Sequence, residues 1–340
     1  MSKILVTGGA GFIGSNVSHR LLGRGHEVTI YDDLSRHGTE KNVAWLRENH
    51  GDGFSLVQAD VRDGSSLKEA MQGCDVVYHH AAQVAVTWSV SDPVTDFEIN
   101  ALGTLNALEA ARSCDPPPVV LFTSTNKVYG GMEEVEIVEQ ETRHEYASLP
   151  QGVSEAQPLD FHSPYGCSKG AADQYVKDYS RIYGLKTVVF RMSCIYGPRQ
   201  FGVEDQGWVA HFLISSVLGR PITIYGDGKQ VRDILYVDDL LEAFEAAVEH
   251  IDVSAGQVYN MGGGPENTMS VWVEFHELLQ ELLGHEVPVS YDEWRPGDQL
   301  VYVSDTRKAQ QDLGWSPKIT VQEGIERLFN WVTKNKNLFL

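Results

Sequence analysis

The segment TGGAGFIG, residues 7–14, constrains the fold most, because it follows the short apolar run KILVTG directly and opens a stretch with helical spacing. Its glycines fall at Gly8, Gly11 and Gly14. Gly8 permits a tight turn, Gly11 lets the backbone approach a pyrophosphate, and Gly14 allows close packing of helix on strand. The free N–H groups at the start of a helix also suit phosphate. A glycine pattern alone is weak, since an ordinary strand-to-helix turn has the same form.

The wider pattern of the chain supports a dinucleotide-binding sheet. Short apolar runs alternate with longer helical stretches over the first two-thirds of the sequence, and these runs are KILVTG, EVTIYDD, FSLVQAD, DVVYHHA, PVVLFTST and KTVVFRM. Near-continuous apolar runs are typical of strands buried on both faces, so we predict a doubly wound α/β fold with a parallel sheet. QVYNMGG is expected to add a strand, and helices are expected at 16–23, 104–113, 271–283 and 321–334. Residues 135–163 have little periodicity, which indicates a functional or disordered loop.

An acidic residue stands where a ribose-binding group belongs. The second run ends in Asp32 and Asp33, roughly 20 residues beyond the glycine segment. A carboxylate there accepts hydrogen bonds from the adenosine 2′-hydroxyl and repels a 2′-phosphate, which favours NAD over NADP. Arg36 argues the other way, because an arginine can hold that phosphate. At the end of the third run, Asp60 and Val61 are placed to hold the adenine edge.

Composition excludes several classes of partner. The formal net charge is −20, which argues against nucleic acid and against an anionic membrane surface. No apolar run approaches the ~20 residues of a membrane span, and the N-terminus does not read as a signal peptide. The four cysteines have no paired spacing, so we expect reduced thiols in the cytoplasm and no metal site. His79 and His80 are adjacent on one run and should point to opposite faces of the sheet.

Tyr165 and Lys169 form a Y-x-x-x-K pattern in SPYGCSKGAADQYV and should share one face of a helix. A tyrosine titrates near ~10, so it becomes a useful base only where positive charge favours its phenolate. The Lys169 ammonium and an oxidised nicotinamide would supply that charge. Thr125, at the end of the fifth run, would bind the reacting hydroxyl and share its proton with Tyr165, although a threonine buried at a strand end needs no such role.

With these residues in place, the sequence resembles the extended short-chain dehydrogenase/reductases, and within them the nucleotide-sugar epimerases. TGGAGFIG, Asp32, Asn100, Thr125 and the Tyr165–Lys169 pair carry the resemblance, which RxxxxYGP (residues 191–198), RDILYVDD, RPGD and DTRKAQQDLGWSPK extend over nearly the whole chain. The resemblance implies bound NAD, a nucleotide-sugar substrate and a homodimer or homotetramer. It also implies an NAD-binding domain of residues 1–198 plus 229–263 and a sugar-nucleotide lobe of residues 199–228 plus 264–340.

The pair Asn126–Lys127 narrows the expected reaction. Family members that dehydrate a sugar carry an Asp-Glu pair directly after the catalytic threonine, and neither an amide nor an ammonium replaces that acid/base couple at neutral pH. Reversible oxidation remains, which is epimerisation. DDLSRHG, AAQVAVT, TSTNKVYG, LDFHSPYGCSKG and YGPRQFGVEDQGWVAHF are similar to the branch that epimerises CDP-sugars at C2 (CDP-paratose/CDP-tyvelose type, with CDP-glucose also possible). The alternatives are a UDP-hexose 4-epimerase and a non-catalytic dinucleotide sensor.

The resemblance assigns the remaining site residues as candidates. Besides Tyr165 and Lys169, the cofactor set is Gly8, Gly11, Phe12, Ile13, Asp32, Asp33, Ser35, Arg36, Asp60, Val61, Ala81, Ala82, Gln83, Asn100 and Thr123. The substrate set is Thr87, Thr125, Asn126, Lys127, Cys194, Gln206, Gly207, Trp208, Val209, Thr223, Tyr225, Arg232 and Arg295. Asn126 and Lys127 could instead only cap a turn, the Gln206–Val209 segment could be a structural loop, Cys194 could be packing, and either arginine could form a surface ion pair.

Overall fold

The computed structural model describes residues 1–204, 206–294 and 298–340, and within them a seven-stranded parallel sheet runs in the order β12-β8-β5-β4-β1-β2-β3. The strands are β1 (Lys3–Thr7), β2 (Glu27–Asp32), β3 (Phe54–Gln58), β4 (Val76–His79), β5 (Val119–Thr125), β8 (Thr187–Met192) and β12 (Val258–Met261). Each lies in one of the seven apolar runs, so the predicted doubly wound sheet is confirmed. The order reverses direction between β1 and β4, which places a crevice at the carboxyl ends of these strands.

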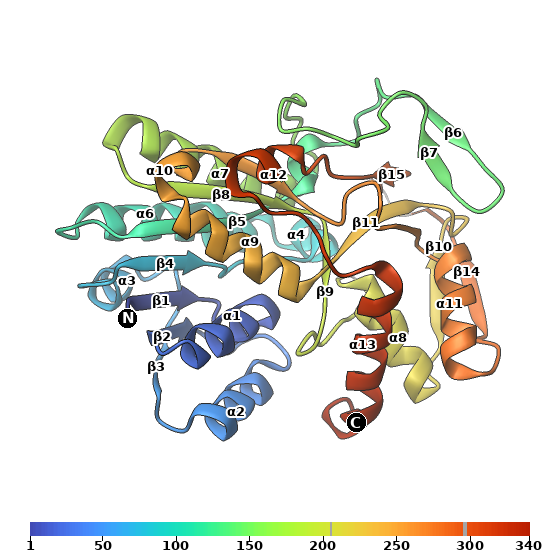
Figure 1. Cartoon of the computed structure of the whole chain (residues 1–340), viewed down its shortest axis with the longest axis horizontal. Coiled ribbons are helices and arrows are strands. Elements are labelled where there is room, and N and C mark those ends of the chain that lie inside the picture. Colours follow the sequence, from blue (N-terminus) through green and yellow to red (C-terminus); the bar gives the residue numbers. More distant parts are fainter. Residues whose placement is uncertain (205, 295–297) are drawn as a thin grey trace.

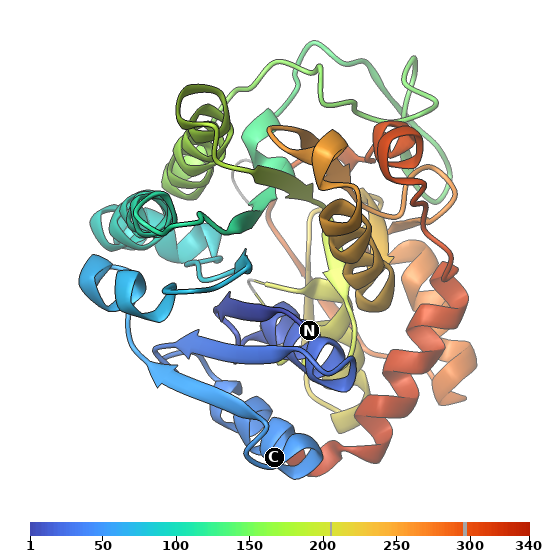
Figure 2. The same ribbon diagram turned by 60° about the vertical axis from the view of Figure 1, so that its left-hand side comes forward.

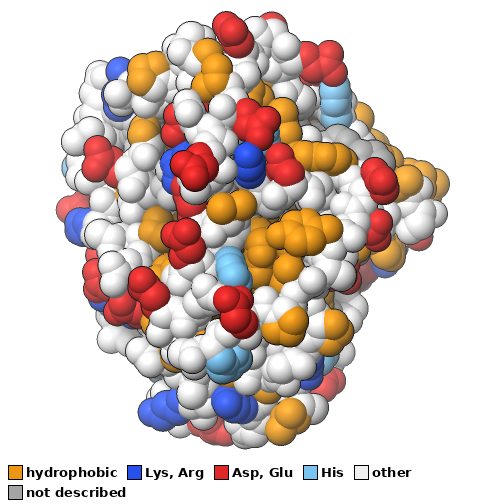
Figure 3. Space-filling view, turned by 90° about the vertical axis from the view of Figure 1, so that its right-hand side faces the viewer, with side chains coloured by type: hydrophobic (Ala, Val, Ile, Leu, Met, Phe, Trp, Pro, Cys, Tyr) orange, Lys and Arg blue, Asp and Glu red, His pale blue; other side chains and the backbone are white. Residues whose placement is uncertain are grey.

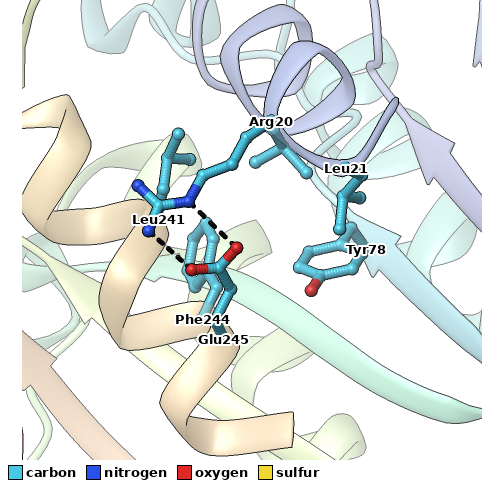
Figure 4. A pocket seen from close by; sticks show the side chains of 7 residues that line it. Arg20, Leu21, Tyr78, Leu241, Phe244 and Glu245 are labelled. Carbon is cyan, nitrogen blue, oxygen red and sulfur yellow. Dashed lines mark hydrogen bonds and ion pairs between the residues drawn. The ribbon is translucent and has the colours of Figure 1, made fainter. Parts of the chain in front are cut away.

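Helices cover both faces of the sheet (Figures 1 and 2). One layer contains α1 (Phe12–Gly23), α2 (Thr39–His50) and α9 (Val237–Glu249), and the other contains α3 (Gly64–Ala70), α6 (Gly103–Arg112) and α7 (Ser163–Tyr183). Each layer has its own buried hydrophobic cluster, because strand side chains alternate between the faces. Figure 4 shows α1 and α9 joined by the ion pair of Arg20 with Glu245, 2.7 Å long, beside Tyr78 of the sheet.

Two short segments connect β4 to α6 at the edge of the crevice. They are α4 (Val86–Ser91) and α5 (Pro93–Phe97), and a π-helical turn, Glu98–Leu102, joins α5 to α6. A 3-10 turn, Asn126–Tyr129, follows β5. Single π-turns inside helices are often found at functional sites.

The C-terminal part of the chain forms a lobe beside the carboxyl ends of the sheet (right-hand side of Figure 1). Its strands are β9 (Cys194–Tyr196), β11 (Val231–Tyr236), β13 (Thr268–Ser270) and β15 (Val301–Tyr302), with β10 (Ile222–Tyr225) pairing β14 (Val289–Asp292). Its helices are α8 (Trp208–Leu218), α11 (Val273–Leu283) and α13 (Val321–Lys334). Figure 3 shows the outer face of the lobe, where hydrophobic side chains gather among acidic ones. The short segments α10 (Ile251–Ser254), α12 (Arg307–Leu313) and the 3-10 turn Lys336–Leu338 complete the order.

The predicted loop at 135–163 is irregular for most of its length but packs on the lobe. It contains a hairpin of β6 (Ile137–Glu139) and β7 (His144–Tyr146). Arg143 binds the Glu274 carboxylate with two nitrogens at 2.7 and 2.6 Å, and Gly152 lies so close to Val303 that a Cβ would meet its carbonyl oxygen at 2.4 Å. The segment is therefore held by specific contacts.

Candidate active site

Thr125, Tyr165 and Lys169 meet at the carboxyl ends of the central strands. Thr125 ends β5, and Tyr165 and Lys169 stand one turn apart on α7, which packs on β5. The side chains of Thr125 and Tyr165 are hydrogen-bonded to each other. Lys169 is 3% exposed, and its Nζ donates a 2.7 Å hydrogen bond to the carbonyl oxygen of Thr123 and lies 4.2 Å from the centre of the Phe122 ring. The expected convergence of the three groups is thus present.

In the ligand-free protein, burial is the main influence on the pKa values of Tyr165 and Lys169. Burial raises the pKa of Tyr165 to about 12, and the nearby charge of Asp96 adds to this, while Thr125 and Arg36 act in the opposite direction. In the ligand-free protein desolvation therefore dominates, and the expectation that the lysine and an oxidised nicotinamide together favour the phenolate stays a prediction for the NAD-bound site. The same burial lowers the pKa of Lys169 to about 7, opposed by the carboxylates of Asp173 and Asp96.

The glycine segment fits a dinucleotide. Gly8 has φ of +66° and lies against the backbone of Ala81, where a Cβ would come within 2.7 Å of the nitrogen. A Cβ on Gly14 would lie 2.1 Å from the carbonyl oxygen of Gly8, so helix and loop touch at this point. Gly11 is the N-cap of α1, and a Cβ on Gly11 would approach only the Gly8 oxygen, at 3.2 Å. Helix α1 has neither a capping side chain nor an acidic residue in its first turn. The first N–H groups of α1, those of Phe12 and Ile13, are thus presented without a capping side chain or first-turn carboxylate, as pyrophosphate binding requires.

Asp32 lies at the end of β2 next to the glycine loop. Its carboxylate accepts hydrogen bonds from the backbone N–H groups of Ala10, at 3.0 Å, and Leu34, at 2.9 Å, while burial raises its pKa. Asp33 binds Ser35 locally, through both the backbone N–H and the hydroxyl. Arg36 belongs to this loop, and its charge lies within electrostatic range of the Tyr165 phenol. This arginine therefore extends along the crevice toward the trio.

The adenine-side candidates lie at the end of β3. Asp60 pairs with Arg62 at 2.7 Å, and this contact lowers the pKa of the Asp60 carboxyl. Val61 is buried, 5% exposed, against Gly103 of α6. Its side chain thus serves packing, and its carbonyl oxygen accepts a hydrogen bond from the Asn106 amide at 3.1 Å.

A hydrogen-bond network behind the trio contains residues that the sequence reasoning missed. Asn100 was expected at the cofactor, but its side chain is 1% exposed and binds protein groups: its oxygen accepts the Gln83 backbone N–H at 2.9 Å, and its amide donates to Asp96 and Ser168. Asp96 and Ser168 had no role assigned. Ala81 and Ala82 follow β4 directly, and the backbone N–H of Ala81 donates to Thr7. Only the folded structure, which brings Asp96, Asn100 and Ser168 close together, reveals this hydrogen-bond network.

A cluster of charges surrounds Lys127, two residues after Thr125. Arg232 donates to Asp298 at 2.7 Å, and the Lys127 ammonium lies 3.8 Å from the same carboxylate oxygen. Burial lowers the pKa of Lys127, and the neighbouring charge of Arg232 adds to this. Cys194 lies within range of both cations and accepts a hydrogen bond from the Trp208 indole at 3.3 Å. Four predicted substrate residues are thus brought together.

The other substrate candidates have varied surroundings. The Asn126 oxygen accepts the Thr125 hydroxyl at 3.4 Å. Gln206 exchanges backbone hydrogen bonds with Val203, and Gly207 has φ of +75° with Gln200 packed against it, so the start of α8 is tightly formed. The Val209 side chain is 2% exposed and lies in the core, which leaves only its backbone for a ligand.

Four further substrate candidates remain, and one of them lies outside the described residues. The Thr223 hydroxyl pairs with Ser290 at 3.3 Å, and the Tyr225 hydroxyl donates to Glu204. Thr87 lies on α4. Arg295 falls outside the described residues.

The histidine pair is separated by the sheet, as expected. His79 stacks on Phe122 and His80 on Phe244, which belong to the two different hydrophobic clusters. Among the described residues no three His, Cys, Asp or Glu side chains are grouped so as to hold a metal ion. No helix in residues 1–204, 206–294 or 298–340 has both the length and the apolar character to cross a membrane.

The sheet, its uncapped glycine turn and the Thr-Tyr-Lys trio define a dinucleotide-dependent enzyme of the extended short-chain dehydrogenase/reductase type. Comparison with protein families is more specific. Residues 4–262 match the model of the NAD dependent epimerase/dehydratase family, and the chain belongs to this family. The protein is an NAD-dependent epimerase, hence an isomerase, with NAD as its cofactor.

Relatives extend over the whole chain. CDP-paratose 2-epimerase of Salmonella typhi is 40% identical over 97% of this chain and 99% of its own. The crystal structure of UDP-glucose 4-epimerase with UDP-glucose from Thermotoga maritima has 31% identity and a TM-score of 0.83, covering 98% of this chain and 99% of that one. The dTDP-glucose 4,6-dehydratase DesIV of Streptomyces venezuelae, solved with NAD bound, has 28% identity and a TM-score of 0.84 over 98% of each chain.

Proposed function

We propose that the protein is a CDP-sugar 2-epimerase of the CDP-paratose/CDP-tyvelose type. The observation that carries the proposal is the turn after Thr125, where Asn126 and Lys127 replace an acid/base couple and Lys127 joins Arg232 at Asp298. The 40% identity to a CDP-paratose 2-epimerase over nearly the full length of both chains supports it. A nucleotide-sugar substrate is common to the epimerase relatives, and the CDP group and the C2 position are the finer assignments.

Each member of the trio has a separate task in this proposal. NAD, when bound, supplies the capacity to oxidise a sugar carbinol and to restore it. Tyr165 accepts the proton of the sugar hydroxyl and returns it, and Thr125, already hydrogen-bonded to Tyr165, orients that hydroxyl. Lys169 supplies positive charge that favours the phenolate, provided that its amine is protonated.

The positive charges of Arg232 and Lys127 are available to bind the sugar nucleotide. Arg232 and Lys127 share a single carboxylate, so the cluster carries a surplus of positive charge within a chain of net charge −20. Guanidinium and ammonium groups are suited to a diphosphate and to sugar hydroxyls. The start of α8, with Trp208, is proposed for the nucleotide base. The predicted boundary between the NAD domain and the substrate lobe stays a prediction.

Product analysis in deuterium oxide tests the proposal. The holoenzyme is given CDP-glucose and UDP-glucose separately, and the products are identified by nuclear magnetic resonance. We expect CDP-mannose from CDP-glucose, with protium retained at C2, because hydride return is internal. Deuterium at C2 would indicate deprotonation, and deoxygenated products would indicate a dehydratase; either result rejects the proposal.

A UDP-hexose 4-epimerase is the second candidate. The UDP-glucose 4-epimerase of Thermotoga maritima, which shares the fold over 98% of this chain, favours it. In the same experiment this function would convert UDP-glucose to UDP-galactose and leave CDP-glucose unchanged. The two outcomes are mutually distinguishable from one set of spectra.

We also propose that the protein forms a homodimer. Large apolar side chains are exposed on neighbouring helices α5 and α7 and on the π-turn between α5 and α6, and these are Val94, Phe97, Leu102, Tyr175 and Ile182. We call this group the helix patch. Exposed apolar side chains on two packed helices are typical of an interface, and a two-fold contact would pair them with the same residues of a second copy.

A further inference from the structure

Asp96 is a carboxylate with no exposed surface behind the trio, and the proposed mechanism does not use it. It lies on α5, immediately before the π-turn. One oxygen accepts the Ser168 hydroxyl at 2.5 Å, and the other accepts the side-chain amides of Gln83 at 3.0 Å and Asn100 at 3.2 Å. The two amides can only donate, and with the Ser168 hydroxyl donating as well the three contacts accommodate an ionised carboxylate. Burial raises the pKa of Asp96, and the Ser168 contact and the Lys169 charge oppose this rise.

The partners of Asp96 connect it to the catalytic helix and to the end of β4. Ser168 precedes Lys169 in the chain, and its Oγ also lies 3.2 Å from the carbonyl oxygen of Tyr165. Asn100 also links the network to Gln83, because its side-chain oxygen accepts a hydrogen bond from the Gln83 backbone N–H. A second contact, from the Tyr165 N–H to the Ser89 hydroxyl at 3.1 Å, holds the start of α7 against α4. The network thus links α5, the π-turn and α7 around the trio.

The charge of Asp96 has no cation in direct contact among these partners, although a buried carboxylate usually has one. Asp173 on α7 is also buried, but it is neutralised by Arg191 of β8 through two contacts of 2.9 Å. His79 ends β4 and His80 follows it; both lie near Lys169 and are neutral, because burial lowers the pKa of each to about 3.

Arg36 approaches the trio from the loop after β2, on the phenol side. The Lys169 ammonium is therefore the cation on the helix side with which Asp96 interacts electrostatically.

We propose that Asp96 is a positioning residue that fixes α7 through Ser168 and Asn100 and serves as the buried counter-charge of the Lys169 ammonium. The inference rests on the proposed roles of Tyr165 and Lys169. Burial lowers the pKa of Lys169 to about 7 even though the charges of Asp173, the larger contribution, and of Asp96 oppose it, so without Asp96 the amine would be less protonated at physiological pH. Asp96 also opposes ionisation of Tyr165, so it moves the titrations of both groups toward higher pH.

The variant Asp96→Asn separates charge from hydrogen bonding. It is isosteric, its oxygen can still accept from Gln83 and Asn100, and the Ser168 hydroxyl can turn its proton to the Tyr165 carbonyl oxygen and accept from the new amide. The ionisation of Tyr165 is followed in the holoenzyme without substrate, using ζ-¹³C-tyrosine resonances assigned with Tyr165→Phe. We expect its midpoint to fall by about half to one pH unit. In activity assays, both limbs of the pH profile of kcat should move by a similar amount to lower pH.

Two further variants distinguish an effect of the Asp96 charge from an effect of its hydrogen bond to Ser168. Asp96→Glu keeps the charge and should keep the Tyr165 midpoint of the wild type. Ser168→Ala removes the hydrogen bond but not the charge, so it should reduce kcat without moving either limb. An unmoved midpoint in Asp96→Asn, or an equal shift in Ser168→Ala, would overturn the inference. Should Asp96→Asn fail to fold, a shifted midpoint in Asp96→Glu would overturn it in the same way, and an unshifted one with thermal stability retained would support it.

The spectroscopic readout needs no substrate, so it remains valid if the proposed sugar is wrong. Failure of the proposed function would appear instead in the product analysis in deuterium oxide, and failure of the proposed base as wild-type turnover in Tyr165→Phe.

Discussion

The Nζ of Lys169 lies 2.7 Å from the carbonyl oxygen of Thr123, in a site where the lysine is only 3% exposed. In the ligand-free protein this hydrogen bond occupies one of the three ammonium donors. The Phe122 ring centre lies 4.2 Å from the amine, and burial lowers the pKa of Lys169 to about 7 against the opposing charges of Asp173 and Asp96. Lys169 therefore titrates near neutral pH.

The first prediction concerns the stability of the protein without ligands. In the unfolded chain Lys169 titrates near ~10.4, so between about pH 7 and 10 the unfolded state binds more protons than the folded state. The free energy of unfolding should accordingly rise with pH by up to about 1.4 kcal/mol per unit over this range. Lys169→Met should lack this contribution and be the more stable protein near pH 7.

Urea denaturation at steps between pH 7 and 9.5 measures the effect as the difference between the two proteins. The comparison cancels the titration of shared groups. Parallel stability curves for wild type and Lys169→Met would show that the amine is not perturbed by burial.

The second prediction concerns the proposed base. Tyr165→Phe removes the hydroxyl that is hydrogen-bonded to Thr125, and general base catalysis typically contributes 10²–10⁴-fold. We expect kcat to fall by at least about 10²-fold while the Kd for NAD, measured by calorimetry, stays within about twofold. Tyr183→Phe, at the exposed C-terminal end of the same helix, is the matched control. Wild-type turnover in Tyr165→Phe would remove this residue from the mechanism.

The sequence predicted the sheet well because its strands are short runs buried on both faces. KILVTG and QVYNMGG became β1 and β12, and the helix expected at 321–334 is α13 with the same bounds. RDILYVDD, quoted only as a motif, forms β11, whose partner strands β13 and β15 have three and two residues. Strands so short carry no periodic signal.

The site residues were likewise predictable only where they stand in a local sequence pattern. Thr125, Tyr165 and Lys169 stand in recognisable local patterns, and the structure brings them together. Asp96 and Ser168 are ordinary polar residues in the sequence, and only the packing of α5 on α7 makes them neighbours. Asp298 was likewise part of a quoted motif, but its contact with Lys127 depends on how the lobe folds back over the turn after β5.

The third prediction addresses cofactor choice. Asp32 binds the N–H groups of Ala10 and Leu34, so Asp32→Ala should loosen the loop as well as remove a ribose acceptor. We expect the Kd for NAD to rise about 10-fold or more and the preference for NAD over NADP to narrow, because the repulsion of a 2′-phosphate is lost. Asp52→Ala, which removes an exposed carboxylate that pairs with Arg47 outside the predicted site, serves as the control. Unchanged affinity for both cofactors would place the ribose elsewhere.

The fourth prediction concerns the cation beside the substrate. Lys127→Met removes one of the two positive charges that share Asp298, and charge-assisted contacts contribute about 1.5–3 kcal/mol. KM for the nucleotide sugar should rise roughly 10- to 100-fold, with the Kd for NAD unchanged. Lys127→Arg retains the charge and should recover part of the affinity. If KM is unaffected in Lys127→Met, this side chain only closes the turn after Thr125.

The last prediction tests the helix patch as a dimer interface. Phe97 is 56% exposed on α5 and Ile182 is 62% exposed on α7, and the two helices pack on each other. A glutamate at either position would place a charge in the middle of a desolvated contact, which costs several kcal/mol when it has no partner. Phe97→Glu and Ile182→Glu should therefore convert a dimer into a monomer in light scattering after size exclusion. Val138→Glu, on the exposed β6 strand of the hairpin, should leave the dimer intact. A wild-type protein that is monomeric at micromolar concentration, or helix-patch variants that remain dimeric, would show that this surface does not hold a second copy.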